Sequence, residues 1–500
     1  MKSAIRNSAF LFLGCVVFHV AGTWNLPLID RDEPRFAEAS REMMERGDYV
    51  IPYFNNQFRF DKPPLTYWAQ VASYRIVGES DFAARFPSAI AAALTALSIF
   101  AWGLRIGGKR VAWWAAIVFT LSLQTFVHAK AAVADMWLVL FVTLAHWSGY
   151  ELLFGDPQEK RLTLNPPSPG TGSALASAQR PTSNIQSSWW WTFYFALAFA
   201  FLAKGPIGWT PLLTVVSTMF FTANQQAAQR FKFLRGLVLT FVVVALWGIP
   251  ALVQTHGEFF RIGIGRHVIG RSFGAMEGHG ANSLGVYLLL LPFYFVTVFA
   301  SFFPWSLKLP WLARRLWKER DKIDNYLLAG TVIIFVIFTF VKTKLPHYTL
   351  PAFPLLALLL SRHLAAAQFS TRTFRNFAAA TVVLFFGIAL VVPSFVARFF
   401  PAADLFKQSC SDLVSGMEFG AIDFTEPSLV WYFRSRVKGF MTPLRRDSVG
   451  QFMEKGGPRF VIVPTDLAPN SPSDWKRFSS QGVNVAKGKR VDLTLMLKPE

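Results

Sequence analysis

The run FAAATVVLFFGIALVVPSFV occupies Phe377–Val396 and contains no charged side chain. A helix needs about 20 mostly apolar residues to cross the hydrocarbon core of a bilayer. Many comparable runs precede it, and because open sheet edges cannot face lipid, they predict transmembrane helices. We expect about eleven spans, or up to thirteen if interrupted runs include re-entrant pieces. The expected spans are 8–28, 82–104, 111–128, 134–154, 189–203, 206–223, 236–254, 284–305, 324–341, 346–361 and 376–397.

The composition supports a membrane protein. Of 500 residues, 53% are hydrophobic and 16% are charged, whereas soluble domains average about a quarter charged residues. The net charge of +20 comes from basic residues in short loops between apolar runs. That pattern indicates cytoplasmic retention and argues against nucleic-acid binding. Two cysteines, Cys15 and Cys410, cannot form a disulfide framework.

The basic loops alternate along the chain and place the N-terminus in the cytoplasm. Lys2 and Arg6 precede the first apolar run, and no small-residue cleavage site follows it, so we interpret this run as a retained span. The opposite side, the periplasm of a bacterial inner-membrane protein, then receives a second set of segments. These are the loops 29–81, 129–133, 204–205, 255–283 and 342–345, and the tail from about 398.

Two domains are expected: a transmembrane catalytic domain over 1–398 and a small soluble periplasmic α/β domain over 399–500. Within the first, 156–188 is rich in Pro, Ser and Gly and predicts a flexible cytoplasmic loop. In the tail, polar turns separate short β-like runs. The predicted strands are Ser428–Phe433, Phe460–Pro464 and Val491–Leu497.

The densest polar cluster is DRDEPRFAE at Asp30–Glu38, directly after the first span. Proline is favoured in a first helical turn, so a helix should begin near Pro34, and Gly47 should end it. Its sequence is amphipathic, so we expect it to lie on the membrane surface. One alternative is that Asp32 is simply the N-cap of this helix. A cap alone, however, does not require four charges in four residues.

A second cluster, FDKPPLTYW at Phe60–Trp68, follows in the same loop. Two prolines hold the backbone after Lys62 extended, immediately before an aromatic-rich helix. The alternative here is a surface lysine that anchors the helix at the headgroup level.

These two clusters, in order with four further motifs, resemble the bacterial lipid A aminoarabinose transferases. That group lies within the protein-mannosyltransferase-like glycosyltransferases of the GT-C fold. The likeness covers roughly residues 8–365, and it is the combination of motifs that is specific. The further motifs are Gly47-Asp48-Tyr49 with Pro52, Ala134-Asp135-Met136, Ala203-Lys204-Gly205-Pro206, and Lys344-Leu345-Pro346-His347-Tyr348-Thr349-Leu350-Pro351.

The resemblance implies an active site on the external face. The family's first-loop acid matches Asp32, its neighbouring arginine matches Arg35, and we add Asp135 to the catalytic set. The lysine that contacts the lipid phosphate matches Lys62, and Arg271, Tyr348 and Lys204 complete the expected phosphate site. No cofactor is required. A divalent cation on Asp61 and His267 is an alternative, although two ligands are too few to define a metal site and many relatives have glutamate in place of Asp61.

The topology agrees independently, because all of these residues, together with Lys344 and His347, lie in or beside the expected external loops. Charges at membrane depth are costly, so Asp135 and Lys204 at span ends point to function. A sugar that leaves a polyprenyl phosphate exposes an anion, which cationic side chains can stabilise. Asp32 can accept the proton of an acceptor hydroxyl, or can orient an acceptor that is already a phosphate.

We therefore predict an inverting glycosyltransferase with a polyprenyl-phosphate sugar donor and, as acceptor, lipid A or another surface glycolipid. Membrane lipid is the surrounding partner. A protein O-glycosyltransferase of the same fold is the first alternative. A secondary transporter is the second, but the sequence has no internal repeat that would support it.

Overall fold

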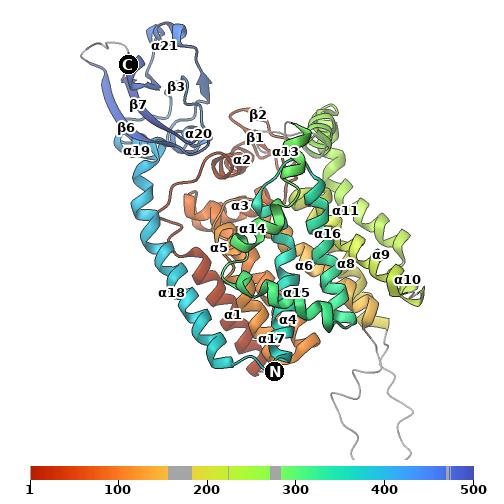
Figure 1. Ribbon diagram of the computed structural model, residues 1–500. Helices are drawn as coiled ribbons and strands as arrows, with labels where there is room; N and C mark the ends of the chain where they lie inside the picture. Colours follow the sequence, from red (N-terminus) through yellow and green to blue (C-terminus); the bar gives the residue numbers. More distant parts are fainter. Residues whose placement is uncertain are drawn as a thin grey trace, which may run out of the picture. The chain divides into compact units, whose positions relative to one another are not determined.

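The computed structural model describes residues 2–155, 183–222, 225–270, 283–468, 472 and 474–499 (Figure 1). Arg271 and the side chain of His267 lie outside the described part of the chain. So does most of the expected loop 156–188.

The chain divides into two compact units. We call them the bundle unit and the loop–tail unit. The bundle unit comprises Met1–Leu13, Ala91–Phe126 and Asp135–Ala378, and the loop–tail unit comprises Gly14–Ile90, Val127–Ala134 and Ala379–Glu500. The loop 29–81, which we expect to be external, and the tail are far apart in sequence but belong to one unit.

Helices make up the bundle unit. Six described helices are long and apolar enough to cross a membrane, or seven if the bent pair Phe293–Ser301 and Trp305–Lys318 forms one span. This bears out a polytopic helical membrane protein, while the count of eleven spans stays a prediction. The elements are the start of α1 (Lys2–Val20, as far as Leu13), α4 (Asp81–Thr120, shared with the other unit), α5 (Leu123–His128, likewise shared), α6 (Asp135–Phe154), α8 (Ser183–Lys204), η1 (Pro206–Trp209), α9 (Thr210–Thr222), α10 (Gln225–Phe231), α11 (Phe233–Gln254), η2 (Phe259–Gly270), α13 (Leu284–Leu289), α14 (Phe293–Ser301), η3 (Trp305–Lys308), α15 (Leu309–Lys318), α16 (Lys322–Phe340), η4 (Pro346–Ala352), α17 (Phe353–Ala366) and the start of α18 (Thr371–Val396).

Helix α4 contains a reversal of the chain at Gly108, whose φ of 74° glycine adopts without strain. Phe100 and Trp113 would lie about 20 Å apart in a straight helix, yet their ring centroids are 5.0 Å apart. The reversal falls within the short basic segment that separates the expected spans 82–104 and 111–128. The expected break between the two runs is therefore present, while their crossing of the membrane as two spans stays a prediction.

The loop–tail unit combines helices with a five-stranded sheet. Its strand order is β4-β3-β5-β7-β6, in which β3 is parallel to β4 and β5, and β7 is antiparallel to β5 and β6. The elements are α1 (Lys2–Val20, from Gly14), α2 (Asp32–Arg46), β1 (Tyr53–Phe54), β2 (Gln57–Phe58), α3 (Leu65–Val77), the start of α4, the end of α18, η5 (Ala397–Phe399), α19 (Pro401–Ser409), β3 (Glu418–Ala421), α20 (Pro427–Phe433), β4 (Met441–Pro443), η6 (Arg446–Ser448), α21 (Val449–Glu454), β5 (Arg459–Pro464), η7 (Thr465–Leu467), β6 (Lys476–Asn484) and β7 (Lys489–Lys498).

Alternation along β5 explains the layers of the tail. Phe460 and Ile462 pack with α19 and α20 on one face of the sheet, while Val461 and Val463 pack with α21 on the other. This is the period of two expected for a strand buried on both faces. The helices and strands of the tail can be followed in Figure 1.

Two of the three predicted tail strands are confirmed, as β5 and β7, but the third is wrong. Ser428–Phe433 belongs to helix α20, which begins at Pro427 and is buried over most of its surface. A short apolar run has no periodicity that separates a buried strand from a buried helix. Pro427 at the first helical position is the local signal that favours the helix.

Helix α2 ends as predicted, because Gly47 adopts the left-handed conformation with a φ of 66°. Its position on the membrane surface stays a prediction, but its charged face does not point to water. The charged face, including Glu38, Arg41 and Glu42, is buried against α20 of the tail. Those charges are satisfied by ion pairs inside the protein, not by water.

Candidate active site

The bundle unit holds a buried ion pair built from two of the sequence motifs. Asp135 is the first residue of α6 and is 6% exposed, and Lys204 is the last residue of α8. The Lys204 Nζ lies 2.5 Å from the Asp135 Oδ1. Each helix end therefore carries one charge of a pair, and each charge favours burial of the other.

A third motif reaches the same place through η4. The His347 Nε2 lies 3.9 Å from the Asp135 Oδ1, and the Lys204 Nζ lies 5.5 Å from the ring centroid of Tyr348. The rings of His347 and Tyr348 are in edge contact at 5.1 Å. The predicted residues Asp135, Lys204 and Tyr348 are thus brought together, and His347 joins them.

The contacts of Lys344 indicate a structural role. Its Nζ donates hydrogen bonds to the carbonyl oxygens of Phe338, at 2.9 Å, and Thr339, near the C-terminal end of α16. Carbonyl groups at a helix end lack intrahelical donors, and a lysine there satisfies them. Lys344 therefore caps the C-terminal end of α16.

In the loop–tail unit, two acids of the Asp30–Glu38 cluster are structural. Glu33 pairs with Arg85 at 2.6 Å and accepts the backbone N–H groups of Ile29 and Ala132. Asp30 accepts the backbone N–H of Ser428 at 2.9 Å and its hydroxyl at 2.5 Å. Burial raises the pKa of Asp30 to about 6, although both hydrogen bonds act to lower it.

Asp32 and Arg35 occupy the first turn of α2, where Asp32 is exposed and Arg35 is half-buried. The alternative of Asp32 as N-cap is wrong, because the N-cap is Arg31 and Asp32 is already helical. Both residues are accessible on a turn whose other acids have structural partners. They remain candidates for chemistry.

Arg59, directly before the second first-loop cluster, is a residue that the sequence analysis missed. The guanidinium of Arg59 lies 3.0 Å from the Asp61 carboxylate and donates to the hydroxyl of Tyr67 at 3.0 Å. The negative charge of Asp32 also acts on Arg59. Arg59 and Asp61 are two residues apart, a spacing that places side chains on one side of an extended segment. Lys62 follows this pair and is half-buried.

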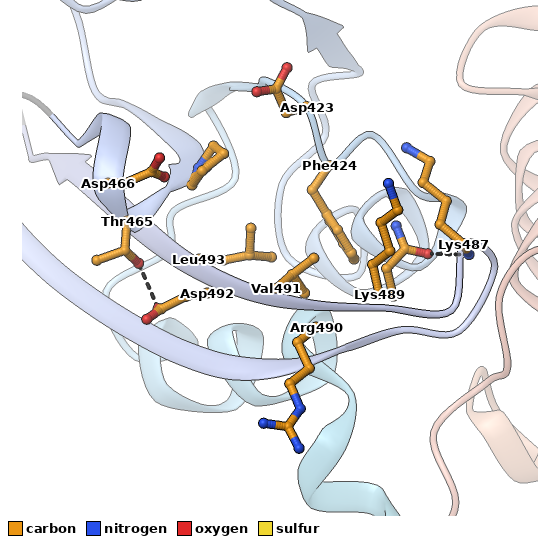
Figure 2. Close-up of a pocket in the computed structure, with 12 residues that line it drawn as sticks. Asp423, Phe424, Thr465, Asp466, Lys487, Lys489, Arg490, Val491, Asp492 and Leu493 are labelled. Carbon is orange, nitrogen blue, oxygen red and sulfur yellow. Dashed lines mark hydrogen bonds between the residues drawn. The ribbon is translucent and has the colours of Figure 1, made fainter.

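The tail holds a separate cavity of about 650 Å³ near the turn between β6 and β7 (Figure 2). Its charged lining is balanced, and Lys487 lies 3.5 Å from Glu426. Balanced charge gives no net field to attract a phosphate. The charged residues of the lining are Asp423, Asp466, Asp492, Lys487, Lys489 and Arg490.

Comparison with known proteins supports the resemblance drawn from the motifs. Residues 61–162 match the family model described as dolichyl-phosphate-mannose-protein mannosyltransferase. An uncharacterised protein of Aquifex aeolicus is 28% identical over 364 residues, which are 72% of this chain and 74% of that protein. The undecaprenyl phosphate-α-4-amino-4-deoxy-L-arabinose arabinosyl transferase of Erwinia tasmaniensis is 28% identical over 66% of this chain. That alignment spans just over half, 54%, of the Erwinia enzyme.

The fold comparison covers nearly the whole chain. The crystal structure of ArnT from Cupriavidus metallidurans bound to undecaprenyl phosphate superimposes with a TM-score of 0.74. The match covers 97% of each chain at 19% sequence identity, which establishes a shared fold. The fold is thus that of the polytopic GT-C membrane proteins. The chain is similar to the aminoarabinose-transferase-like and protein-mannosyltransferase-like glycosyltransferases, as its motifs predict.

Proposed function

We propose that the protein is an inverting glycosyltransferase that moves a sugar from undecaprenyl phosphate, or a related polyprenyl phosphate, to lipid A on the periplasmic face of the inner membrane. The observation that carries this proposal is the meeting of Asp135, Lys204 and Tyr348. These residues come from three separate motifs and gather around one buried ion pair. The names of the transferase relatives favour 4-amino-4-deoxy-L-arabinose as the sugar.

The proposed reaction is a single displacement at the anomeric carbon. The bond from that carbon to the phosphate oxygen breaks, the phosphate keeps the electron pair, and an acceptor oxygen forms the new bond. Lys62 and the hydroxyl of Tyr348 stabilise the departing anion as positioned donors. A hydroxyl acceptor gives its proton to Asp32, whereas a phosphate acceptor needs no base, so that Asp32 then orients it.

For Lys204 we propose a different role from the one first expected. Its charge is compensated by Asp135 at 2.5 Å, so the pair attracts an anion less than a lone lysine does. We propose that the pair holds the end of α8 beneath Tyr348 and orients that ring. The metal assignment to Asp61 and His267 stays a prediction, because Asp61 pairs with Arg59 and the His267 side chain lies outside the described residues.

A protein O-glycosyltransferase is the second candidate, favoured by the family model that matches residues 61–162. Mass spectrometry of lipid A and of envelope proteins, from cells with and without the gene, separates the two. A pentose-sized increment on lipid A that depends on the gene supports the first proposal. A glycan increment on proteins alone supports the second, and no change in either would overturn both.

The same reaction should be reproduced with purified protein, a polyprenyl-phosphate sugar and lipid A. The donor should be consumed one-for-one with the glycosylated product, and the product should have the inverted anomeric configuration. A retained configuration would contradict a single displacement.

A further inference from the structure

Helix α20 of the tail contacts the chain on both sides of Asp32, within one compact unit. Before α2, the hydroxyl of Tyr432 accepts the backbone N–H of Leu28 at 2.9 Å, and Ser428 donates twice to Asp30. Tyr432 is held in turn by its own donation to Asp81 at 2.8 Å. The segment that leads into α2 is therefore tied to α20 at Ser428, near its start, and at Tyr432, near its end.

Along α2, the end of α20 is held by buried charges. Arg434 pairs with Glu38, and its second amino group lies 2.6 Å from Glu45. Arg41 stacks over the ring of Trp431 at 3.9 Å and donates to the Trp431 carbonyl at 2.8 Å. Removing one partner of a buried pair leaves the other charge uncompensated, so this end of the contact resists displacement.

The first turn of α2 lacks a side-chain N-cap hydrogen bond, which is the local interaction that often stabilises a helix start. An N-cap side chain usually accepts one of the free amides at a helix start. Arg31 occupies the N-cap, and its side chain makes no capping hydrogen bond within the described structure. Glu33 ties this turn to Arg85 and to the backbone of Ala132. The tail contacts at Asp30 and at Glu38 bracket the same turn, so its placement depends in part on the tail.

We infer that helix α20 of the tail is a positioning element for the reaction, with Ser428 and Arg434 as positioning residues that set the location of Asp32 and Arg35. The inference rests on the proposed function and extends it, because it gives the tail a part in sugar transfer. A displacement of about 1 Å from a remote change can cost on the order of a hundredfold in rate. Loss of the Ser428 contact should therefore lower kcat.

The test uses full-length protein with Ser428→Ala. This variant keeps the hydrogen bond from the backbone N–H of residue 428 to Asp30, so we expect it to fold. We expect kcat to fall about tenfold or more, with the KM for the polyprenyl donor unchanged. Ser428→Thr keeps the hydroxyl and should restore most of the rate. Arg446→Ala, which breaks the exposed tail pair with Asp423, is the matched control and should keep wild-type kcat.

A double-variant cycle separates positioning from general stability. If Ser428 acts through Asp32, Ser428→Ala should cause little further loss in an Asp32→Asn background. Losses that multiply, or a wild-type kcat in Ser428→Ala, would overturn the inference.

Hydrogen exchange provides a measurement independent of turnover. Amides of residues 30–36 should exchange faster in Ser428→Ala than in the wild type, while those of α3 should be unchanged. Equal exchange at 30–36 would overturn the positioning role even if the proposed function holds. Wild-type protein that transfers no sugar would instead refute the proposed function, and with it any part of the tail in transfer.

Discussion

Removing the charge of Lys204 should destabilise the bundle unit, because Asp135 would stay buried without its partner. The Asp135 side chain is 9% exposed and that of Lys204 is 14% exposed, with 2.5 Å between the charged atoms. Breaking a buried pair from one side typically costs about 3–5 kcal/mol. We expect Lys204→Met to cost an amount in the lower part of that range, since the polar ring of His347 lies 3.9 Å from the same carboxylate.

Removing both charges should cost much less than the sum of the two single changes. In the double variant Lys204→Met with Asp135→Asn no buried charge is left unpaired, and such replacements are often close to neutral. The difference between the double variant and the two single variants gives the coupling free energy. We expect it to be on the order of 2 kcal/mol or more.

The assay is unfolding in detergent micelles, followed by tryptophan fluorescence against increasing denaturant. Lys318→Met is the matched control, because Lys318 is exposed on α15, and its effect should be within about 0.5 kcal/mol. A Lys204→Met protein as stable as the control would show that the pair does not form. Sugar transfer should stay low in the double variant, and full transfer would remove the pair from the site.

Four further predictions concern the loop–tail unit. Asp32→Asn should lower sugar transfer about 10²–10⁴-fold if Asp32 is the base, and full activity of this variant would leave Asp32 no catalytic role. Lys62→Ala should lower turnover about a hundredfold. An unchanged rate of the chemical step would exclude Lys62 from the phosphate site. Burial raises the pKa of Glu38 from 4.5 to about 7, against the action of Arg41 and Arg434, so the folded state binds this proton more tightly than the unfolded state does. The stability that this group contributes is fully present below pH 4.5 and is lost as the pH rises to about 7, a change of about 3 kcal/mol in the free energy of unfolding. Glu38→Gln should therefore flatten the dependence of that free energy on pH in this range. An unchanged slope in the variant would show that another group causes the dependence. An enzyme fused at Glu500 should be active only if it works in the periplasm, and a positive cytoplasmic reporter would reverse the topology.

The sequence by itself determined the features that depend on neighbouring residues. Apolar runs identified membrane helices because a charge buried in lipid is costly at every position of a span, so a span must be apolar along its whole length. The end of α2 followed from Gly47, and the strands β5 and β7 followed from short runs of β-branched and apolar residues. The ordered motifs indicated the fold before any packing was known.

The tertiary structure decided which charges perform chemistry and which support the fold. Asp30 and Glu33 look alike beside Asp32 in the sequence, but their partners Ser428 and Arg85 lie far along the chain. The apolar run Ser428–Phe433 has no periodicity that separates a helix from a strand, and only the tertiary structure shows that α20 packs against α2. Local patterns specify secondary structure, whereas the partner of a buried charge is selected by packing between distant segments, where an unpaired charge costs several kcal/mol.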